Sequence, residues 1–369
     1  MPASSSSPRN NSPMGICTPI NGGWQYLWAD YNLLVTATRL IEDNRRGLTF
    51  AELVFQNHDN GQHLRQARIS LTDAREKAML AIQLRALDKD TPWQAIVEGT
   101  CKDLLQRFRQ GEAVIYVGLD DLPSTPMYRL WPFIIEGELN SLFGSGQSMK
   151  STLSHLWALS IQTGMQVFGW EVQQGNVLIL DYETRADTVN MSLRALTRGV
   201  HFPPTPILYR RCYRPIADDI EAIADAVYRQ NVDVIIVDSA TPASGGAIND
   251  SETQSRLLAA LRSLHRTILL IDHESKGQAK EVRGKGEPAN KEISAIGAAV
   301  KMHQVRSAWY AMRGAPGLRT VRTSLWDIKG NTRHLHQAGI GLEYVFTEDG
   351  HHRWDTIEVM CTALTGTGE

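Results

Sequence analysis

The stretch FGSGQSMKSTL, Phe143 to Leu153, places two glycines, a lysine and hydroxyl residues at the junction of an expected strand and an expected helix. The strand is the run ELNSLF, residues 138–143, and a helical pattern follows the loop. Glycine allows a sharp turn. The N–H groups of such a loop and of the helix N-terminus face one point and attract an anion. The stretch therefore predicts a phosphate-binding loop.

The loop approaches the nucleotide-binding pattern GxxxxGK[ST], in which the lysine reaches the outer phosphates and the next hydroxyl binds Mg²⁺. Lys150 and Ser151 take these two positions. Met149 stands where the second glycine of the pattern is expected, and we predict that the site tolerates it because a residue at a helix start needs no glycine. The alternative is a Gly/Ser turn before an ordinary helix. The predicted ATP-binding residues are Gly144, Ser145, Gly146, Gln147, Ser148, Met149, Lys150, Ser151 and Thr152.

Beyond the loop, short apolar runs alternate with helical patterns. The runs GNVLILDYE, VDVIIVDS and TILLIDHES each follow or precede a helical stretch such as ADTVNMSLRALTRG or ETQSRLLAALRSLHR. Apolar strands separated by helices are typical of a mainly parallel sheet that is covered on both faces. Residues 307–359 predict several antiparallel strands instead, with GAPG and TEDGH as turns. Residues 133–369 are therefore predicted to form an α/β domain that ends in antiparallel strands.

The N-terminal part of the chain has a different pattern. Residues 23–120 predict a smaller α+β domain, with a hairpin around NRRG in which Gly47 takes the left-handed conformation. Two helices follow it, with capping arrangements at Asp73 and Thr91. Residues 1–22, rich in Ser, Pro and Asn, predict a disordered tail without an apolar segment. Residues 121–132 contain three prolines and predict a linker.

Acidic residues end three of the apolar runs. Asp238 follows VDVIIV and is expected to hold magnesium together with Ser151. Asp181 and Glu183 end LILDYE, and either can emerge at the carboxyl edge of the sheet, where ligands bind in such folds. We predict that Glu183 is the base that deprotonates the attacking water. Asp272 and His273 end the third run, and spacing alone leaves a structural role for His273 open.

Charge and cysteine usage limit the remaining function classes. The chain holds 38 Lys plus Arg against 40 Asp plus Glu, so it gives no global reason to expect a polyanionic partner. Locally, residues 276–291 contain five basic residues and two acidic ones, which predicts a loop able to follow a nucleic-acid backbone or a simple solvated loop. Four isolated cysteines fit a reducing cytoplasm, and no apolar segment predicts membrane contact.

The ordered set GSGQSMKST, VLILDYE, VDVIIVDS and ILLIDHESKG resembles the RecA-like P-loop ATPases, and most closely the hexameric replicative helicases of the RepA and DnaB type found on plasmids, phages and bacterial chromosomes. The resemblance covers residues 133–348. It implies a RecA-like fold, ATP and Mg²⁺ as cofactors, and a hexameric ring acting on single-stranded DNA, with replication proteins as further partners. It also implies that Glu183 is the catalytic glutamate, Asp238 the magnesium-associated acid and His273 a sensor of the terminal phosphate.

Such rings lend a lysine and an arginine to the neighbouring subunit's site. Lys329 in DIKGNTRHL matches the lysine, but Asn331 replaces the arginine. Arg283, Arg306 or Arg333 is expected to supply the missing charge. The alternatives to a helicase are a nucleotide-gated loader or filament protein on DNA that hydrolyses ATP slowly, and a RecA-like ATPase that acts on protein partners.

Overall fold

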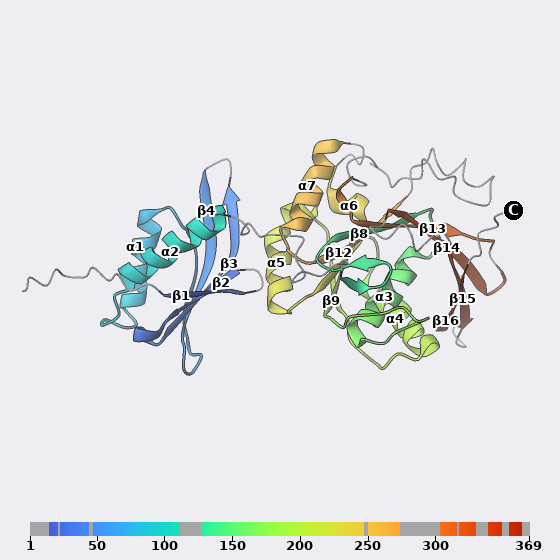
Figure 1. The fold of residues 1–369 in the computed structure, drawn as a ribbon, viewed down its shortest axis with the longest axis horizontal. Coiled ribbons are helices and arrows are strands. Elements are labelled where there is room, and N and C mark those ends of the chain that lie inside the picture. The colour runs from blue at the N-terminus through green and yellow to red at the C-terminus, as the bar shows by residue number, and fades with distance from the viewer. Residues whose placement is uncertain are drawn as a thin grey trace, which may run out of the picture. The chain divides into compact units, whose positions relative to one another are not determined.

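The computed structural model divides the chain into two compact units, residues 1–119 and 120–369 (Figure 1). The structure describes residues 15–20, 23–43, 47–110, 127–246, 250–273, 303–315, 317–329, 339–348 and 354–363. The two units are described separately.

The smaller unit is built on a five-stranded antiparallel sheet in the order β1-β2-β3-β4-β5. The predicted hairpin is confirmed by the pairing of β3 with β4, and Gly47 has a φ of +64°. The predicted tail is wrong for residues 16–20, which form the edge strand β1 despite Pro19, because a proline is tolerated on a strand that has only one neighbour. The strands are β1 (Ile16–Ile20), β2 (Gly23–Trp28), β3 (Leu33–Asp43), β4 (Leu48–Asn57) and β5 (His63–Ser70).

Two helices, α1 (Ala74–Arg85) and α2 (Trp93–Gln110), complete this unit and share its core with the sheet. The Asp73 side chain caps α1 by accepting hydrogen bonds from the N–H groups of Arg75 and Glu76. Glu76 accepts from the backbone N–H of Ser70 at 2.7 Å, so it ties the helix to β5. The Thr91 hydroxyl donates to Asp88.

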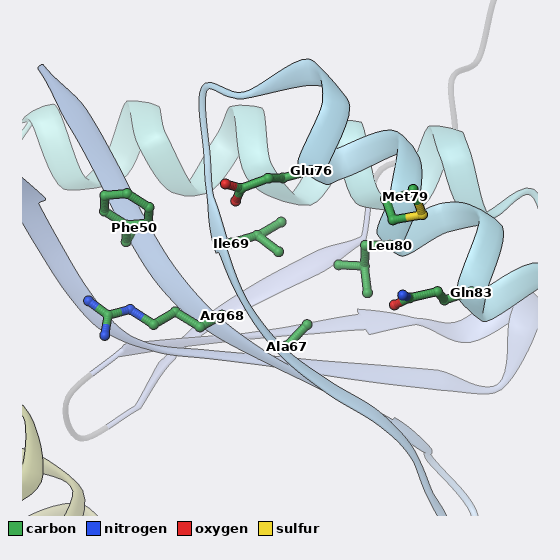
Figure 2. A pocket seen from close by; sticks show the side chains of 8 residues that line it. All are labelled: Phe50, Ala67, Arg68, Ile69, Glu76, Met79, Leu80 and Gln83. Atoms are coloured by element: carbon green, nitrogen blue, oxygen red, sulfur yellow. The ribbon is translucent and has the colours of Figure 1, made fainter. Parts of the chain in front are cut away.

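A groove of about 380 Å³ lies between α1 and the β4–β5 side of this sheet (Figure 2). Its lining is mainly apolar, and its two charged members are engaged: Arg68 lies 5.7 Å from the Phe50 ring centre and Glu76 binds Ser70. The lining holds no pair of groups suited to acid–base chemistry. Its residues are Phe50, Ala67, Arg68, Ile69, Glu76, Met79, Leu80 and Gln83.

The larger unit contains a nine-stranded sheet in the order β10-β9-β11-β12-β8-β13-β14-β15-β16. The six strands from β10 to β13 run parallel, and β14 to β16 continue the sheet in antiparallel fashion. The fold class is therefore the predicted one, α/β with a mainly parallel core sheet. The strands are β8 (Leu139–Gly144), β9 (Val177–Asp181), β10 (Leu208–Arg211), β11 (Val234–Asp238), β12 (Thr267–His273), β13 (Ser307–Arg313), β14 (Thr320–Lys329), β15 (Ile340–Glu348) and β16 (Trp354–Ala363).

Helices bury both faces of the parallel part of the sheet, as continuous apolar strands require (Figure 1). In β11, Val234 and Ile236 pack into the core beneath α3 and α4, whereas Ile235 and Val237 pack into the core beneath α5 and α7. Successive side chains of a strand point to opposite faces of the sheet and therefore pack into two separate cores. The helices are α3 (Lys150–Thr163), α4 (Ala186–Val200), α5 (Ile220–Arg229) and α7 (Ser251–Arg262).

Two sequence expectations need correction in the larger unit, and one helix was not predicted. Residues 128–130, predicted as part of the linker, form β6 (Tyr128–Leu130) and pair with β7 (Ile134–Ile135) because Leu130 and Ile134 are buried. The first strand of the expected antiparallel tail, β13, lies parallel to β8. The segment after Asp238 begins with the short helix α6 (Ala240–Ser244), which buries Ala240 and Ala243.

Within the described residues, no helix combines the length and apolarity that a membrane crossing needs. The four cysteines are all free thiols.

Candidate nucleotide-binding site

The phosphate loop connects β8 to α3, as the sequence predicts, and Lys150 is its central side chain. The ammonium group is buried and donates to the carbonyl oxygens of Gly144 at 3.0 Å and Ser145 at 2.7 Å. It also lies 3.3 Å from Ser148 Oγ. Lys150 thus fills the inside of its own loop. A phosphate group entering the loop offers charged acceptors in place of these carbonyl groups, which strengthens the hydrogen bonds.

Met149 adopts the left-handed conformation, with φ +62° and ψ +21°, and caps the N-terminus of α3. The expectation of an ordinary helical backbone at this position is therefore wrong. The loop reverses direction just before the helix, and a left-handed residue at this point disfavours any side chain with a Cβ atom. The Met149 side chain is partly buried and packs against the core beneath α3 and α4.

Two strands beyond β8 brace the phosphate loop. A Cβ atom at Gly144 would overlap the carbonyl oxygen of Ala311 on β13, so this close approach requires glycine. Arg313, at the end of β13, donates to the Gln147 side chain, and its buried Nε has no partner of its own. Thr323 on β14 donates to the Ser148 carbonyl at 3.2 Å. The loop conformation is therefore set partly by residues that follow it by about 165 positions or more.

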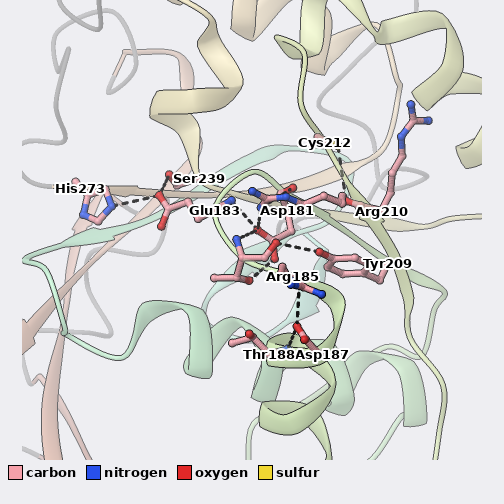
Figure 3. Close-up of polar contacts among 12 residues, drawn as sticks. Asp181, Glu183, Arg185, Asp187, Thr188, Tyr209, Arg210, Cys212, Ser239 and His273 are labelled. Carbon is pink, nitrogen blue, oxygen red and sulfur yellow. Dashed lines mark hydrogen bonds and ion pairs between the residues drawn. The ribbon is translucent and has the colours of Figure 1, made fainter.

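Glu183 lies on the turn after β9, at the carboxyl edge of the sheet (Figure 3). Its carboxylate accepts a hydrogen bond from the buried Ser239 hydroxyl and lies 3.7 Å from His273 Nε2. The interaction with His273 is the largest cause of the lowered pKa of Glu183. The structure thus brings together the two residues predicted as base and phosphate sensor, at the ends of β9 and β12.

Asp181, the alternative to Glu183, is buried and points into the turn, where it accepts hydrogen bonds from that turn's backbone. It is not available to a bound ligand. Its neighbour in the parallel register is Asp238 at the end of β11. The carbonyl oxygen of Asp238 accepts from Tyr182 N at 2.7 Å, which fixes the two strand ends side by side.

Asp238 and Ser151 form the oxygen pair expected at a magnesium site. Burial raises the pKa of Asp238 to about 6, although its hydrogen bond with Ser151 acts in the opposite direction. A partly buried carboxylate beside a hydroxyl suits a hard divalent cation, whose charge replaces the proton. The residues therefore fit Mg²⁺, which when bound neutralises phosphate charge. In the described part of the chain, no group of three or more His, Cys, Asp or Glu residues gathers as an all-protein metal site.

Of the predicted trans-acting cations, Arg306 lies at the end of the strands opposite the phosphate loop, and Lys329 lies part of the way toward that end. Arg306 donates its backbone N–H to Leu139 at the start of β8, and its Nε lies 3.8 Å from Glu138 Oε2. Lys329 pairs in register with Ala308 and donates to the His303 carbonyl at 3.2 Å. From Leu139 to Gly144 the strand covers about 17 Å at about 3.3 Å per residue. Arg306 therefore lies at the end of the strands that is remote from the phosphate loop of its own chain.

Some predicted site residues lie outside the described part of the chain, and three residues near the site were not predicted. Arg283, Asn331, Arg333 and the basic segment 276–291 lie outside the described residues. Ser239, Arg313 and Thr323 were missed by sequence reasoning. Ser239 directly follows a predicted metal ligand, which is a weak signal, whereas nothing local to Arg313 or Thr323 marks them as neighbours of the loop.

Comparisons with known proteins agree with this geometry. Residues 107–279 match the family model of the AAA domain, and this range includes the phosphate loop and the ends of β9, β11 and β12. No curated protein gives a significant match to the chain. An AAA domain implies nucleotide binding, usually with Mg²⁺. The family match and the site geometry together support an ATPase of the AAA/RecA-like family.

Proposed function

We propose that this protein is a magnesium-dependent ATPase that forms a ring and moves along single-stranded DNA, as a replicative helicase of the RepA and DnaB type. ATP would bind the loop of residues 144–152, Glu183 would activate water, and His273 would report the terminal phosphate. Replication proteins are the expected further partners, and the cytoplasm the expected location. The ring is proposed as a hexamer.

The observation that carries the ring is the position of Arg306 and Lys329. A transferring phosphoryl group needs more positive charge than Lys150 alone supplies. Arg306 lies about 17 Å along the strand from its own loop, and Lys329, level with Ser141 through Ala308, lies about 10 Å from it, so Arg306 in particular suits a neighbouring subunit's site better than its own. Arg306 is the stronger candidate for the finger, because the guanidinium offers a planar fork that binds phosphate oxygens.

DNA binding is supported by the order of the elements. The segments after β11 and β12 both leave from the edge of the sheet that carries Glu183 and His273. The second segment contains Lys276, Lys280, Arg283, Lys285 and Lys291. In a ring these residues would repeat around a central channel, where backbone phosphates release counterions on binding.

One observation favours a second candidate, the slowly hydrolysing loader or filament protein. Met149 places a strained backbone at the phosphate loop, and a loop that closes poorly around the phosphates binds ATP without fast turnover. The two candidates share the nucleotide site and differ in directional strand displacement.

The first test measures ATP hydrolysis by the purified protein with and without single-stranded DNA, with the particle mass recorded in parallel. Lys150→Ala serves as the blank, and Glu183→Gln is expected to bind ATP without cleaving it. DNA-stimulated hydrolysis by a ring-sized particle supports the helicase. Binding with slow turnover on DNA supports the loader. Full turnover in Glu183→Gln would remove this residue from the base role.

Mixing two inactive variants tests the trans arrangement directly. Rings of Arg306→Ala lack the finger, and rings of Glu183→Gln lack the base. In a mixed ring, an Arg306→Ala subunit followed by a Glu183→Gln subunit rebuilds a complete site at their interface. We expect the mixture to regain hydrolysis. A mixture that stays as inactive as its two components would argue that both residues act within one chain.

A further inference from the structure

The proposed base Glu183 does not lie on a strand but on the turn that follows β9, with its side chain exposed at the site. A general base must hold its carboxylate within hydrogen-bond reach of the attacking water. An isolated turn offers little rigidity for this purpose. The elements that fix the turn therefore matter for catalysis even when they touch no ligand.

Asp181 fixes this turn from within (Figure 3). Its Oδ1 accepts hydrogen bonds from the N–H groups of Glu183 and Thr184, both at 2.8 Å. Its Oδ2 accepts from the Thr184 hydroxyl. The two backbone donors flank the Cα atom of Glu183, so one carboxylate sets the orientation of both peptide groups around the base.

A buried carboxylate is stable in its charged form only when a counter-charge or several hydrogen bonds compensate for the lost water. Arg211, in register with Asp181 on the adjacent strand β10, supplies this charge at 3.1 Å from Oδ1. The guanidinium also lies 5.5 Å from the ring centre of Tyr213, and the Cys212 N–H donates to the Asp181 carbonyl. The strand β10 is thereby tied to the turn that carries Glu183.

We propose that Asp181 and Arg211 are a positioning pair for Glu183: they hold the turn so that the base points at the terminal phosphate, without contacting the nucleotide themselves. The inference rests on the proposed function for the role of Glu183. It adds two residues whose loss should slow the chemical step and leave nucleotide binding intact.

The same strand provides a matched control. Arg210 precedes Arg211, so its side chain leaves the opposite face of the strand, and it forms a comparable ion pair with Asp219, at 2.6 Å and with similar exposure. The test compares Arg211→Met with Arg210→Met in the full-length protein. The readouts are kcat and KM for ATP, the Kd of a fluorescent ATP analogue and the thermal unfolding temperature.

We expect Arg211→Met to lower kcat by about tenfold or more, because a small misplacement of a catalytic group is costly. The KM and the analogue Kd should stay within about twofold of wild type, since the phosphate loop is unchanged. Arg211→Lys should recover part of the loss, because it keeps the charge but not the fork. Equal kcat values in Arg211→Met and Arg210→Met would overturn the proposal.

Hydrogen exchange separates failure of this inference from failure of the proposed function. The backbone amides of Glu183 and Thr184 should exchange faster in Arg211→Met than in wild type and in Arg210→Met, whether or not the protein hydrolyses ATP. Unchanged exchange rejects the pair. Exchange can accelerate in Arg211→Met while wild type and Glu183→Gln show the same turnover. In that case Asp181 and Arg211 do hold the turn, but Glu183 is not the base. Asp181→Asn, which keeps the acceptor oxygen, provides a second variant if Arg211→Met does not fold.

Discussion

At Met149 the left-handed backbone favours glycine, whereas the partly buried side chain contributes packing to the core. A side chain in the left-handed region costs roughly 1–2 kcal/mol, whereas glycine pays no such steric cost. Met149→Gly removes the strain but also a partly buried side chain, and Met149→Ala removes the side chain alone. We expect the glycine variant to be about 1 kcal/mol more stable than the alanine variant, the reverse of the usual order in helices. Chemical denaturation measures the difference, and a more stable alanine variant would contradict the left-handed assignment.

Asp238 predicts a pH dependence. The folded protein keeps the Asp238 proton up to about pH 6, whereas the unfolded chain loses it near the ordinary pKa of 3.8. Between these values the folded state binds more protons, so this group makes the free energy of unfolding fall as the pH rises, by at most about 3 kcal/mol. Asp238→Asn should remove that fall. The measurement compares the free energy of unfolding of wild type and Asp238→Asn in denaturant from pH 4 to pH 7 without metal. The same pH dependence in the two proteins would contradict the prediction. With Mg²⁺ and ATP present, the cation should stabilise wild type more at pH 7 than at pH 5.

Single residues differ in how far the sequence predicts them. Lys150 and Ser151 follow from the local pattern, and the structure places both at the loop. Glu183 was chosen over Asp181 at the level of the sequence, and the structure adds a physical reason, because the Asp181 carboxylate accepts hydrogen bonds from its own turn. Arg313 was unpredictable, since its neighbour Gln147 lies 166 positions earlier.

At the scale of elements, the approach of β13 to β8 decides whether the phosphate loop can form. In Gly144→Ala the added methyl would overlap the Ala311 carbonyl oxygen, and backbone cannot move aside cheaply. We expect a loss of a few kcal/mol in stability together with loss of ATP binding. Gly146→Ala is the control, because a Cβ atom there meets nothing within 4 Å. Thermal unfolding and titration with an ATP analogue test both variants. A Gly144→Ala variant that is stable and binds ATP would show that β13 does not approach Gly144 as closely as described.

The element types in the larger unit were largely predictable because apolar runs and helical patterns alternate clearly. The direction of β13 was not predictable. Strand direction depends on which neighbour it pairs with, and β13 pairs with β8, 167 residues before it in register. The helix α6 was missed because ATPAS is short and contains proline, so burial of its alanines decides its conformation.

At the scale of the whole molecule, the basic segment separates the two candidates that act on DNA from the ATPase that acts on protein partners. Charge reversal of Lys280 and Lys285 removes the local positive excess without changing Arg283, a candidate for the arginine finger, or any other predicted residue of the nucleotide site. For a DNA motor we expect loss of DNA-stimulated hydrolysis with unchanged basal hydrolysis, measured at several salt concentrations. A wild-type stimulation that survives the reversal would exclude this segment from DNA binding. Hydrolysis that never responds to DNA would favour an ATPase acting on protein partners.

The strand β14 has a consequence for communication around a ring. It runs from Thr323, which binds the phosphate loop through Ser148, to Lys329 at the other end of the strand. This is a distance of about 20 Å along one hydrogen-bonded strand. In the proposed ring, the occupancy of one site would shift the cation offered to the next site, and the sites would depend on one another. Thr323→Val removes the hydrogen bond to the loop and keeps the size and shape of the side chain. We expect Thr323→Val to lower the Hill coefficient of ATP hydrolysis, because the sites then hydrolyse ATP independently. The affinity of a single site for ATP should change little.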